Sequence, residues 1–176
     1  MRVIAGEAKG KRLFAPRTAA TRPATDRLRE SVFGTLGDRP RGANVLDLFA
    51  GSGAFGIEAL SRGAVQATFV DREPAAIDAI RRNVLATGFE ASANVSRGDA
   101  ATFLRHTAET YDIVFLDPPY AEVELLALLL AGPDLRRVTR GLLVLRAFRK
   151  HAPGIPEQWS LARERDVGED VVRYLT

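Results

Sequence analysis

The stretch Val45-Leu-Asp-Leu-Phe-Ala-Gly-Ser-Gly-Ala-Phe-Gly56 decides the fold of this chain, because in it a strand pattern runs through a glycine turn into a helix pattern. Residues 45–49 form a short, mostly apolar run that ends at the turn, which is typical of a buried parallel strand. The helix pattern covers residues 54–62. Gly51 and Gly53 carry no Cβ, so the backbone of the turn can approach a ligand closely.

The same alternation continues toward the C-terminus. Strand patterns cover residues 67–70, 91–96, 111–116 and 141–146, and helix patterns cover residues 74–87, 100–106 and 122–130. Two weaker strand patterns, at 159–164 and 171–175, would close the sheet as an antiparallel pair. Alternating strands and helices place a parallel sheet between two layers of helices. The sequence therefore predicts an α/β fold with a Rossmann-like, seven-stranded, mostly parallel sheet and helices on both faces.

An extension precedes this α/β unit. Residues 2–15 have the pattern of a β-hairpin, and a helix then begins after Thr25, whose hydroxyl suits a helix N-cap. Gly42 marks the end of the extension. We therefore expect two parts, an N-terminal hairpin and helix at 1–42 and a catalytic domain at 43–176.

The composition limits the classes of protein that the chain can represent. Its 176 residues, 46% apolar and 27% charged, are typical of one globular domain. No apolar run approaches the roughly 18 residues of a membrane span, so we expect a cytoplasmic protein without a membrane partner. The absence of cysteine excludes disulfides, thiolate metal sites and methyl transfer through a cysteine nucleophile. With two histidines, no metal site is expected.

Charge is unevenly distributed along the chain. The net charge is +3, but residues 1–42 carry +6 and the remainder carries −3. Such asymmetry indicates a basic arm that meets a polyanion. A basic but merely solvated surface is the alternative.

The glycine turn also predicts the class of cofactor. Its G-x-G-x-x-G pattern alone would equally suit a dinucleotide. Asp47 stands just before the turn, where a carboxylate would repel a pyrophosphate but suits the ammonium of a methionine moiety. No Lys-Ser/Thr pair follows the glycines, so the turn is not a P-loop.

Aspartates follow the next two strand patterns as well. Asp71 can accept hydrogen bonds from both hydroxyls of a ribose, and Asp99 can accept one from an adenine amine while Ala100 lines the ring. Each of these carboxylates could instead cap a helix. Taken together they match one molecule of S-adenosylmethionine. The residues expected to bind it are Asp47, Phe49, Ala50, Gly51, Ser52, Gly53, Asp71, Arg72, Asp99 and Ala100.

The tetrapeptide Asp117-Pro118-Pro119-Tyr120 follows the fourth strand pattern and carries the predicted catalytic groups. The lone pair of an exocyclic amine on a purine is delocalised into the ring, so the amine is a poor nucleophile. The Asp117 carboxylate and the Pro118 carbonyl can each accept one of its N–H bonds and aim the lone pair at a methyl donor. The two prolines fix the backbone, and Tyr120 offers a ring on which an extruded base can stack. A simple proline turn at a strand end is the alternative.

With these residues in view, the chain resembles the bacterial 16S rRNA guanine-amino methyltransferases of the RsmD family. The likeness covers nearly the whole chain and runs through MRVIAG, KGKRL, TRPATDRLRESVF, VLDLFAGSGAFGIEALSRGA, FVDRE, GDA and VFLDPPY, in that order. The resemblance implies a class I methyltransferase that uses S-adenosylmethionine to methylate the N2 amine of one guanine. It further implies a substrate within the 30S subunit or a late assembly intermediate. We expect a monomer. Past Tyr120 the likeness thins.

The resemblance also implies that the N-terminal part covers the cofactor and contacts RNA. Its cations can pair with phosphates irrespective of sequence. The residues expected to contact RNA are Lys9, Lys11, Arg12, Arg22, Thr25, Arg27 and Arg29. Arg27 and Arg29 could instead be structural and pair with Asp26 or Glu30.

Two other functions remain open on the residues alone. A DNA adenine-N6 methyltransferase would use the same site chemistry, although such enzymes normally need a separate recognition domain. A non-catalytic RNA-binding ribosome assembly factor could retain the fold. The intact glycine turn and Asp117 favour an enzyme over that alternative.

Overall fold

The structure, a computed structural model, describes residues 1–16 and 25–176. In chain order its elements are α1 (Asp26–Leu36), β1 (Asn44–Leu48), α2 (Ala54–Ser61), β2 (Gln66–Asp71), α3 (Pro74–Thr87), the 3₁₀ turn η1 (Glu90–Ser92), β3 (Ala93–Arg97), α4 (Ala100–His106), β4 (Tyr111–Leu116), α5 (Val123–Ala131), α6 (Pro133–Val138), β5 (Thr139–Phe148), the 3₁₀ turn η2 (Arg149–His151), β6 (Leu161–Val167) and β7 (Asp170–Leu175). Within the described ranges, no helix has both the length and the apolar character that crossing a bilayer requires.

The strands form one seven-stranded sheet in the order β3-β2-β1-β4-β5-β7-β6. The strands β1 to β5 pair in parallel, and β7 is antiparallel to both β5 and β6. The predicted Rossmann-like sheet with an antiparallel C-terminal pair is therefore confirmed. The strand order reverses between β1 and β4, and in such sheets ligands bind beyond the carboxyl ends of the strands at this point.

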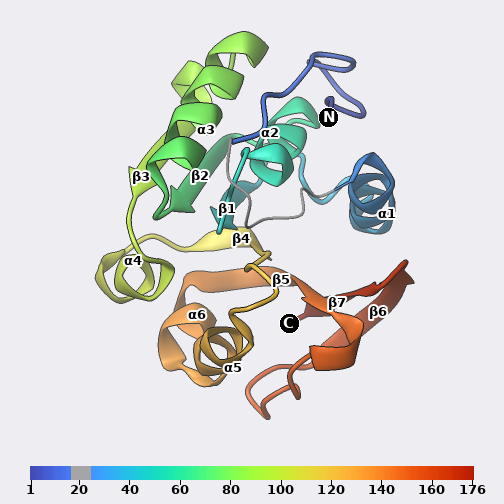
Figure 1. Cartoon of the computed structure of the whole chain (residues 1–176), viewed down its shortest axis with the longest axis vertical. Helices are drawn as coiled ribbons and strands as arrows, with labels where there is room; N and C mark the ends of the chain where they lie inside the picture. Colours follow the sequence, from blue (N-terminus) through green and yellow to red (C-terminus); the bar gives the residue numbers. More distant parts are fainter. Residues whose placement is uncertain (17–24) are drawn as a thin grey trace.

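Helices cover both faces of the sheet, as predicted (Figure 1). One face packs against α1, α2 and α3, and its core contains a cluster of three aromatic rings. The Phe55 and Phe115 ring centroids are 5.0 Å apart, and the Phe33 centroid lies 5.7 Å from that of Phe115. The other face packs against α4, α5 and α6 with a core of leucines and Trp159. Phe55 of this cluster also lines the pocket at the predicted site.

Three elements differ most from the expectation. Helix α6 was not predicted, because its six residues, of which only Leu135 and Val138 are buried, are too few to establish a helical period. Strand β6 (Leu161–Val167) lies two to three residues later than the predicted range 159–164. Strand β5 extends beyond its predicted range at both ends. Its extra C-terminal residues carry Phe148 to the site described below.

The N-terminal extension is held against α2 by buried polar groups. Its hairpin is shorter than predicted, with a single antiparallel bridge between Arg2 and Arg12. The buried Glu58 carboxylate accepts hydrogen bonds from the backbone N–H groups of Ile4 (2.7 Å) and Ala5 (3.1 Å). These contacts satisfy backbone donors that a two-residue pairing leaves free.

A second set of hydrogen bonds, made by one side chain, joins the extension to the glycine turn. The Asn83 side chain on α3 is fully buried. Its Nδ2 donates to the carbonyls of Phe14 and Ser52, both at 2.8 Å, and its Oδ1 accepts from the Phe14 N–H at 2.7 Å. One side chain therefore fixes the end of the extension and the predicted cofactor turn relative to each other.

Gly6 tests whether the extension is docked as described. A Cβ on Gly6 would lie 1.7 Å from the carbonyl oxygen of Ser61 on α2, whereas a Cβ on Gly10 would meet nothing within 4 Å, and both glycines have φ +83°. We expect Gly10→Ala to lower the free energy of unfolding by about 1–2 kcal/mol, the cost of a left-handed alanine. Gly6→Ala should lower it by a further amount of about 1–3 kcal/mol through the clash.

Urea unfolding followed by circular dichroism measures both values, and trypsin cleavage at Lys9 reports undocking. Equal stability of the two variants would contradict the docking of Gly6 on α2.

Candidate active site

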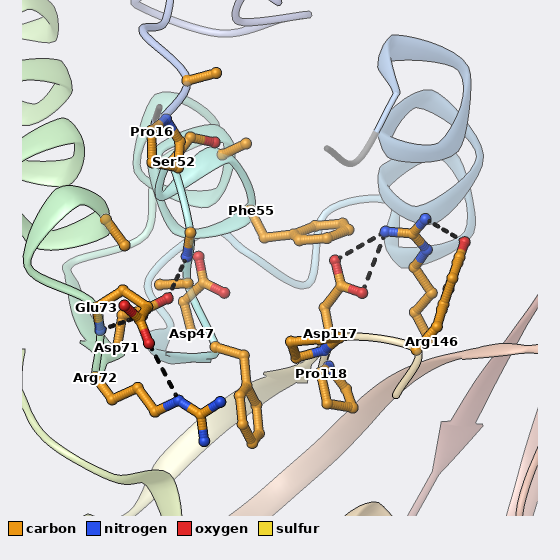
Figure 2. Close-up of a pocket in the computed structure, with 18 of the residues that line it drawn as sticks. Pro16, Asp47, Ser52, Phe55, Asp71, Arg72, Glu73, Asp117, Pro118 and Arg146 are labelled. Atoms are coloured by element: carbon orange, nitrogen blue, oxygen red, sulfur yellow. Dashed lines mark hydrogen bonds and ion pairs between the residues drawn. The ribbon is translucent and has the colours of Figure 1, made fainter. Parts of the chain in front are cut away.

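A pocket of about 750 Å³ opens at the carboxyl ends of β1, β2 and β4, where the strand order reverses. Its volume suits a ligand of nucleoside size with room for part of a substrate. Figure 2 shows carboxylates at two sides of this pocket and Pro16 of the extension at its upper edge. Eleven of the predicted site residues line it: Asp47, Phe49, Ala50, Gly51, Ser52, Asp71, Arg72, Asp117, Pro118, Pro119 and Tyr120.

Asp47 forms the floor of the pocket at the end of β1. It is 1% exposed, and its Oδ2 accepts a hydrogen bond from the Gly56 N–H at 2.9 Å. Burial raises the pKa of Asp47 well above its usual value, and the nearby carboxylates of Asp117 and Asp71 raise the pKa further. A cationic group bound here would relieve this unfavourable environment, which fits the predicted ammonium contact.

Phe49, which directly follows β1, has a φ of +58°. Residues with large side chains rarely adopt this left-handed conformation, and such strain clusters at binding sites. The conformation turns the chain into the glycine loop. Gly53 does not line the pocket; it precedes α2 as its N-cap residue, and its N–H donates to the Ala50 carbonyl at 2.7 Å.

Asp71 at the end of β2 joins two loops of the pocket. Its Oδ2 accepts from the Gly51 N–H at 2.8 Å, and its Oδ1 accepts from the Glu73 N–H at 2.9 Å. Each carboxylate oxygen has a second lone pair, so both can still accept a ribose hydroxyl. Arg72 lines the pocket but turns its guanidinium to Glu122, with Nη2 at 2.8 Å from Oε1. Glu73, a third carboxylate on this side of the pocket, was not predicted from the sequence.

Asp99 and Ala100 are not among the described residues that line this pocket. Asp99 is the N-cap of α4, where its Oδ1 accepts from the Thr102 N–H at 3.0 Å, which is the alternative weighed above. Ala100 is buried in the core below α4. The predicted adenine contact of these two residues stays a prediction.

Asp117 stands at the end of β4 with its carboxylate against the guanidinium of Arg146 (Figure 2). Arg146 Nη1 lies 3.2 Å from Oδ1 and 3.1 Å from Oδ2. Burial raises the pKa of Asp117, while the charge and hydrogen bonds of Arg146 oppose this rise. Arg146 therefore favours the ionised carboxylate, the form that accepts hydrogen bonds without donating one.

Arg146 is itself buried and joins three strand ends. From β5 it also binds Asp170 of β7, with Nε at 3.1 Å and Nη2 at 3.0 Å from Oδ2. Its Nη2 donates to the Tyr120 hydroxyl at 2.9 Å, and that hydroxyl donates to Asp170 Oδ1. Although burial lowers the pKa of Arg146, its carboxylate partners raise the pKa by more. The ring of Tyr120 also packs on Phe148, with centroids 5.4 Å apart.

Arg146 and Asp170 were given no role from the sequence. The signal that could have found them is a charged residue inside an otherwise apolar strand pattern, because buried charges need partners. Their pairing with each other and with Asp117 depends on strand order, which the local pattern does not contain.

The residues predicted to contact RNA fall into four groups, the last of which is Arg29 alone. The side chains of Lys9, Lys11, Arg12 and Arg27 are exposed, and Lys11 Nζ also donates to the Thr87 carbonyl at 3.1 Å. Thr25 caps α1 through its hydroxyl and is itself exposed. Arg22 lies outside the described residues.

The expectation for Arg29 is corrected. Its side chain is fully buried, and its Nη2 donates to the Arg2 carbonyl and to Asp26 Oδ1 at 2.9 Å. A guanidinium with no solvent exposure cannot reach a phosphate of a docked RNA. Arg29 therefore fastens the N-terminal hairpin to α1, which is the structural alternative stated above.

The arrangement has two adjoining parts. The Asp47–Asp71 side provides carboxylates and apolar walls that fit the ammonium, ribose and sulfonium portions of S-adenosylmethionine. The Asp117 side provides a rigid acceptor beside an aromatic ring. This combination suits methyl transfer to a group that carries N–H bonds.

The chain is similar to known proteins over its whole length. All of the chain, residues 1–176, matches the family described as Conserved hypothetical protein 95. The chain is 35% identical over 175 residues to the Ribosomal RNA small subunit methyltransferase D of Escherichia coli, covering 98% of this chain and 88% of that protein. It is 46% identical over 132 residues to YlbH of Bacillus subtilis, covering 73% of this chain and 72% of that protein.

Among solved structures, a hypothetical protein of Thermus thermophilus, TTHA0928, has a TM-score of 0.82 and 32% identity, and the match covers 99% of this chain and 98% of that one. The protein therefore uses S-adenosylmethionine as its cofactor. The chain belongs to the Conserved hypothetical protein 95 family, the RsmD family of S-adenosylmethionine-dependent methyltransferases.

Proposed function

We propose that this protein transfers a methyl group to the exocyclic N2 amine of one guanine in the 16S rRNA of the small ribosomal subunit. The observation that carries the proposal is the Asp117 carboxylate, paired with the Arg146 guanidinium at the edge of the pocket. The substrate class is supported by the name of the Escherichia coli relative, a small-subunit rRNA methyltransferase.

The cofactor end of the pocket orients the methyl donor. S-adenosylmethionine supplies a sulfonium methyl group that a nitrogen lone pair can attack. Asp47 accepts from the ammonium of the methionine moiety and Asp71 from the ribose hydroxyls, while Asp99 accepts from the adenine amine. Because these carboxylates come from different strand ends, they fix the donor at three separate points.

The Asp117 end activates the acceptor. The Asp117 carboxylate and the Pro118 carbonyl each accept one N–H bond of the amine, which pulls the nitrogen toward tetrahedral geometry. Arg146 occupies one side of the carboxylate and leaves lone pairs on both oxygens for the substrate. No strong general base is required, because the nitrogen loses a proton readily once it is methylated.

Tyr120 stacks on the extruded base. Its hydroxyl is held by both Arg146 and Asp170, so the ring has a fixed orientation. A fixed ring lowers the entropic cost of holding a flipped nucleotide. The exposed cations Lys9, Arg12 and Arg27 then pair with phosphates around the site.

The partner that we propose is the 30S subunit or a late assembly intermediate in the cytoplasm. The protein acts as a monomer, and its residues 1–42 face the RNA.

Labelled cofactor incubated with small subunits from cells that lack the enzyme should yield one N2-methylguanosine. Label in DNA adenine instead would replace the proposal with the DNA-methylating alternative. Cofactor binding without any transfer would favour the non-catalytic assembly factor.

Asp117→Ala should abolish catalysis without preventing binding. Removal of the acceptor that polarises the amine should lower the rate of methyl transfer by about 100-fold or more. The affinities for small subunits and for S-adenosylmethionine should stay near those of the wild type. Single-turnover transfer of label and equilibrium binding measure these quantities, and near-normal transfer by the variant would remove Asp117 from the mechanism.

Asp71→Ala should weaken cofactor binding more than Glu73→Ala, a matched carboxylate on the same side of the pocket. Loss of two hydrogen bonds to the ribose and of the bond to the Gly51 N–H should lower the affinity by about 10- to 100-fold. Calorimetric titration with S-adenosylmethionine gives both affinities. Equal effects of the two substitutions would count against the ribose role of Asp71.

Arg146→Met should move the acid limb of the activity profile to higher pH. Burial raises the pKa of Asp117 and Arg146 opposes it, so loss of the cation raises the pKa further. Because only the ionised carboxylate accepts the amine, the midpoint of the kcat profile should rise by about 1 to 3 pH units.

Arg146→Lys, which retains a charge, should shift the midpoint less. A loss of kcat that is the same at every pH would assign Arg146 a purely structural role.

A further inference from the structure

On the edge strand β6, arginines project from one face of the sheet and carboxylates from the other. Arg163 pairs in register with Tyr174 of β7, and Arg165 pairs with Val172. Directly paired residues of antiparallel strands project from the same face, and Tyr174 and Val172 belong to the core beneath α1, α2 and α3. Arg163 and Arg165 therefore lie on that face. In agreement, both guanidinium charges oppose the rise that burial causes in the pKa of Tyr174.

The opposite face of β6 is neutralised. Arg173 Nε lies 2.7 Å from Glu164 Oε2, and Arg149 Nη1 lies 3.2 Å from Asp166 Oδ2. In the described part of the chain, by contrast, no carboxylate lies within 4.0 Å of Arg163 or Arg165. Charges on an edge strand also prevent pairing with other sheets, but that role does not require cations on one face and paired anions on the other.

This cationic face is in line with the active site. Arg146 of β5 pairs in register with Val172 of β7, and Val172 pairs with Arg165 of β6, so the three residues form one row across the sheet. Neighbouring strands lie about 4.8 Å apart, which puts the Cα atoms of Arg165 and Arg146 roughly 10 Å apart. Figure 1 shows β6 beyond β7 at the outer edge of the sheet. The row begins beside the catalytic carboxylate Asp117 and ends at the exposed cation of Arg165.

We propose that Arg163 and Arg165 bind phosphates of the RNA strand that carries the target base, next to the nucleotide held at Asp117. The guanidinium fork matches the geometry of a phosphate, and both cations are exposed and lack a carboxylate partner among the described residues. This assignment rests on the proposed RNA substrate. It extends the RNA-binding surface from the N-terminal extension to the C-terminal hairpin, so that cations lie on two sides of the pocket.

The double substitution Arg163→Ser/Arg165→Ser tests the assignment. With small subunits that lack the methyl group as substrate, KM should rise roughly 10- to 30-fold at about 0.1 M salt while kcat at saturation is retained. The slope of log KM against log salt should fall by about 1.4, since each phosphate contact to a single strand contributes about 0.7. Cofactor affinity and urea stability should stay at wild-type values.

Arg81→Ser/Arg105→Ser is the matched control. It removes the same charge from exposed residues of α3 and α4 that have no carboxylate partner within residues 1–16 and 25–176. This control should leave KM and the salt slope near the wild-type values. Arg163→Lys/Arg165→Lys should restore most of the affinity.

If Arg163→Ser/Arg165→Ser behaves like the control while the wild type methylates rRNA, the β6 assignment alone is overturned. A wild type that transfers no methyl group to rRNA would overturn the proposed function together with this assignment.

Discussion

The buried ion pair between Arg146 and Asp117 is the interaction on which the active site depends. A carboxylate at the end of a central strand is strongly disfavoured in its ionised form unless a cation neutralises it. The cation comes from the neighbouring strand, and its own charge is balanced by Asp170 one strand further. Three strand ends thus combine to pair one carboxylate with a cation and to hold one ring, that of Tyr120, in place. The antiparallel C-terminal strands therefore contribute to the candidate active site, although the glycine turn and the predicted cofactor residues lie on the other side of β4.

A second set of buried polar groups connects the N-terminal extension to the cofactor pocket. Glu58 and Asn83 use their hydrogen-bonding capacity on backbone groups of residues 4, 5 and 14 and of the glycine turn. Such contacts specify one position of the extension, because an alternative position would leave these buried groups without partners. The extension consequently borders the pocket through Ala15 and Pro16. In the proposed function, the binding of RNA by its cations and the binding of the cofactor in the pocket therefore involve the same docked element.

Most of the fold could be predicted because each element carries its own signal. Helices α3 and α4 and strand β4 have the predicted bounds, since a proline, a capping aspartate and an apolar run mark them locally. Asp47, Asp71 and Asp117 were found because they stand near or just after the ends of strand patterns, and the ends of parallel strands meet at one edge of a sheet. For Asp99, a position soon after a strand did not distinguish a cofactor contact from a helix cap, and its carboxylate does cap α4. The prediction for Arg29 was wrong, because no local pattern reveals its burial.

By itself, the sequence determined the strand–helix alternation, the glycine turn and the placement of Asp117-Pro118-Pro119-Tyr120 at a strand end. These features depend on residues that are close together in the chain. Only the tertiary structure decided that Arg146 and Asp170 face Asp117, that Arg29 is internal, and that Arg163 and Arg165 share the face of the active site. Those facts depend on strand order and register, which arise from packing between residues far apart in sequence, and a shift of one residue in register would turn each side chain to the opposite face.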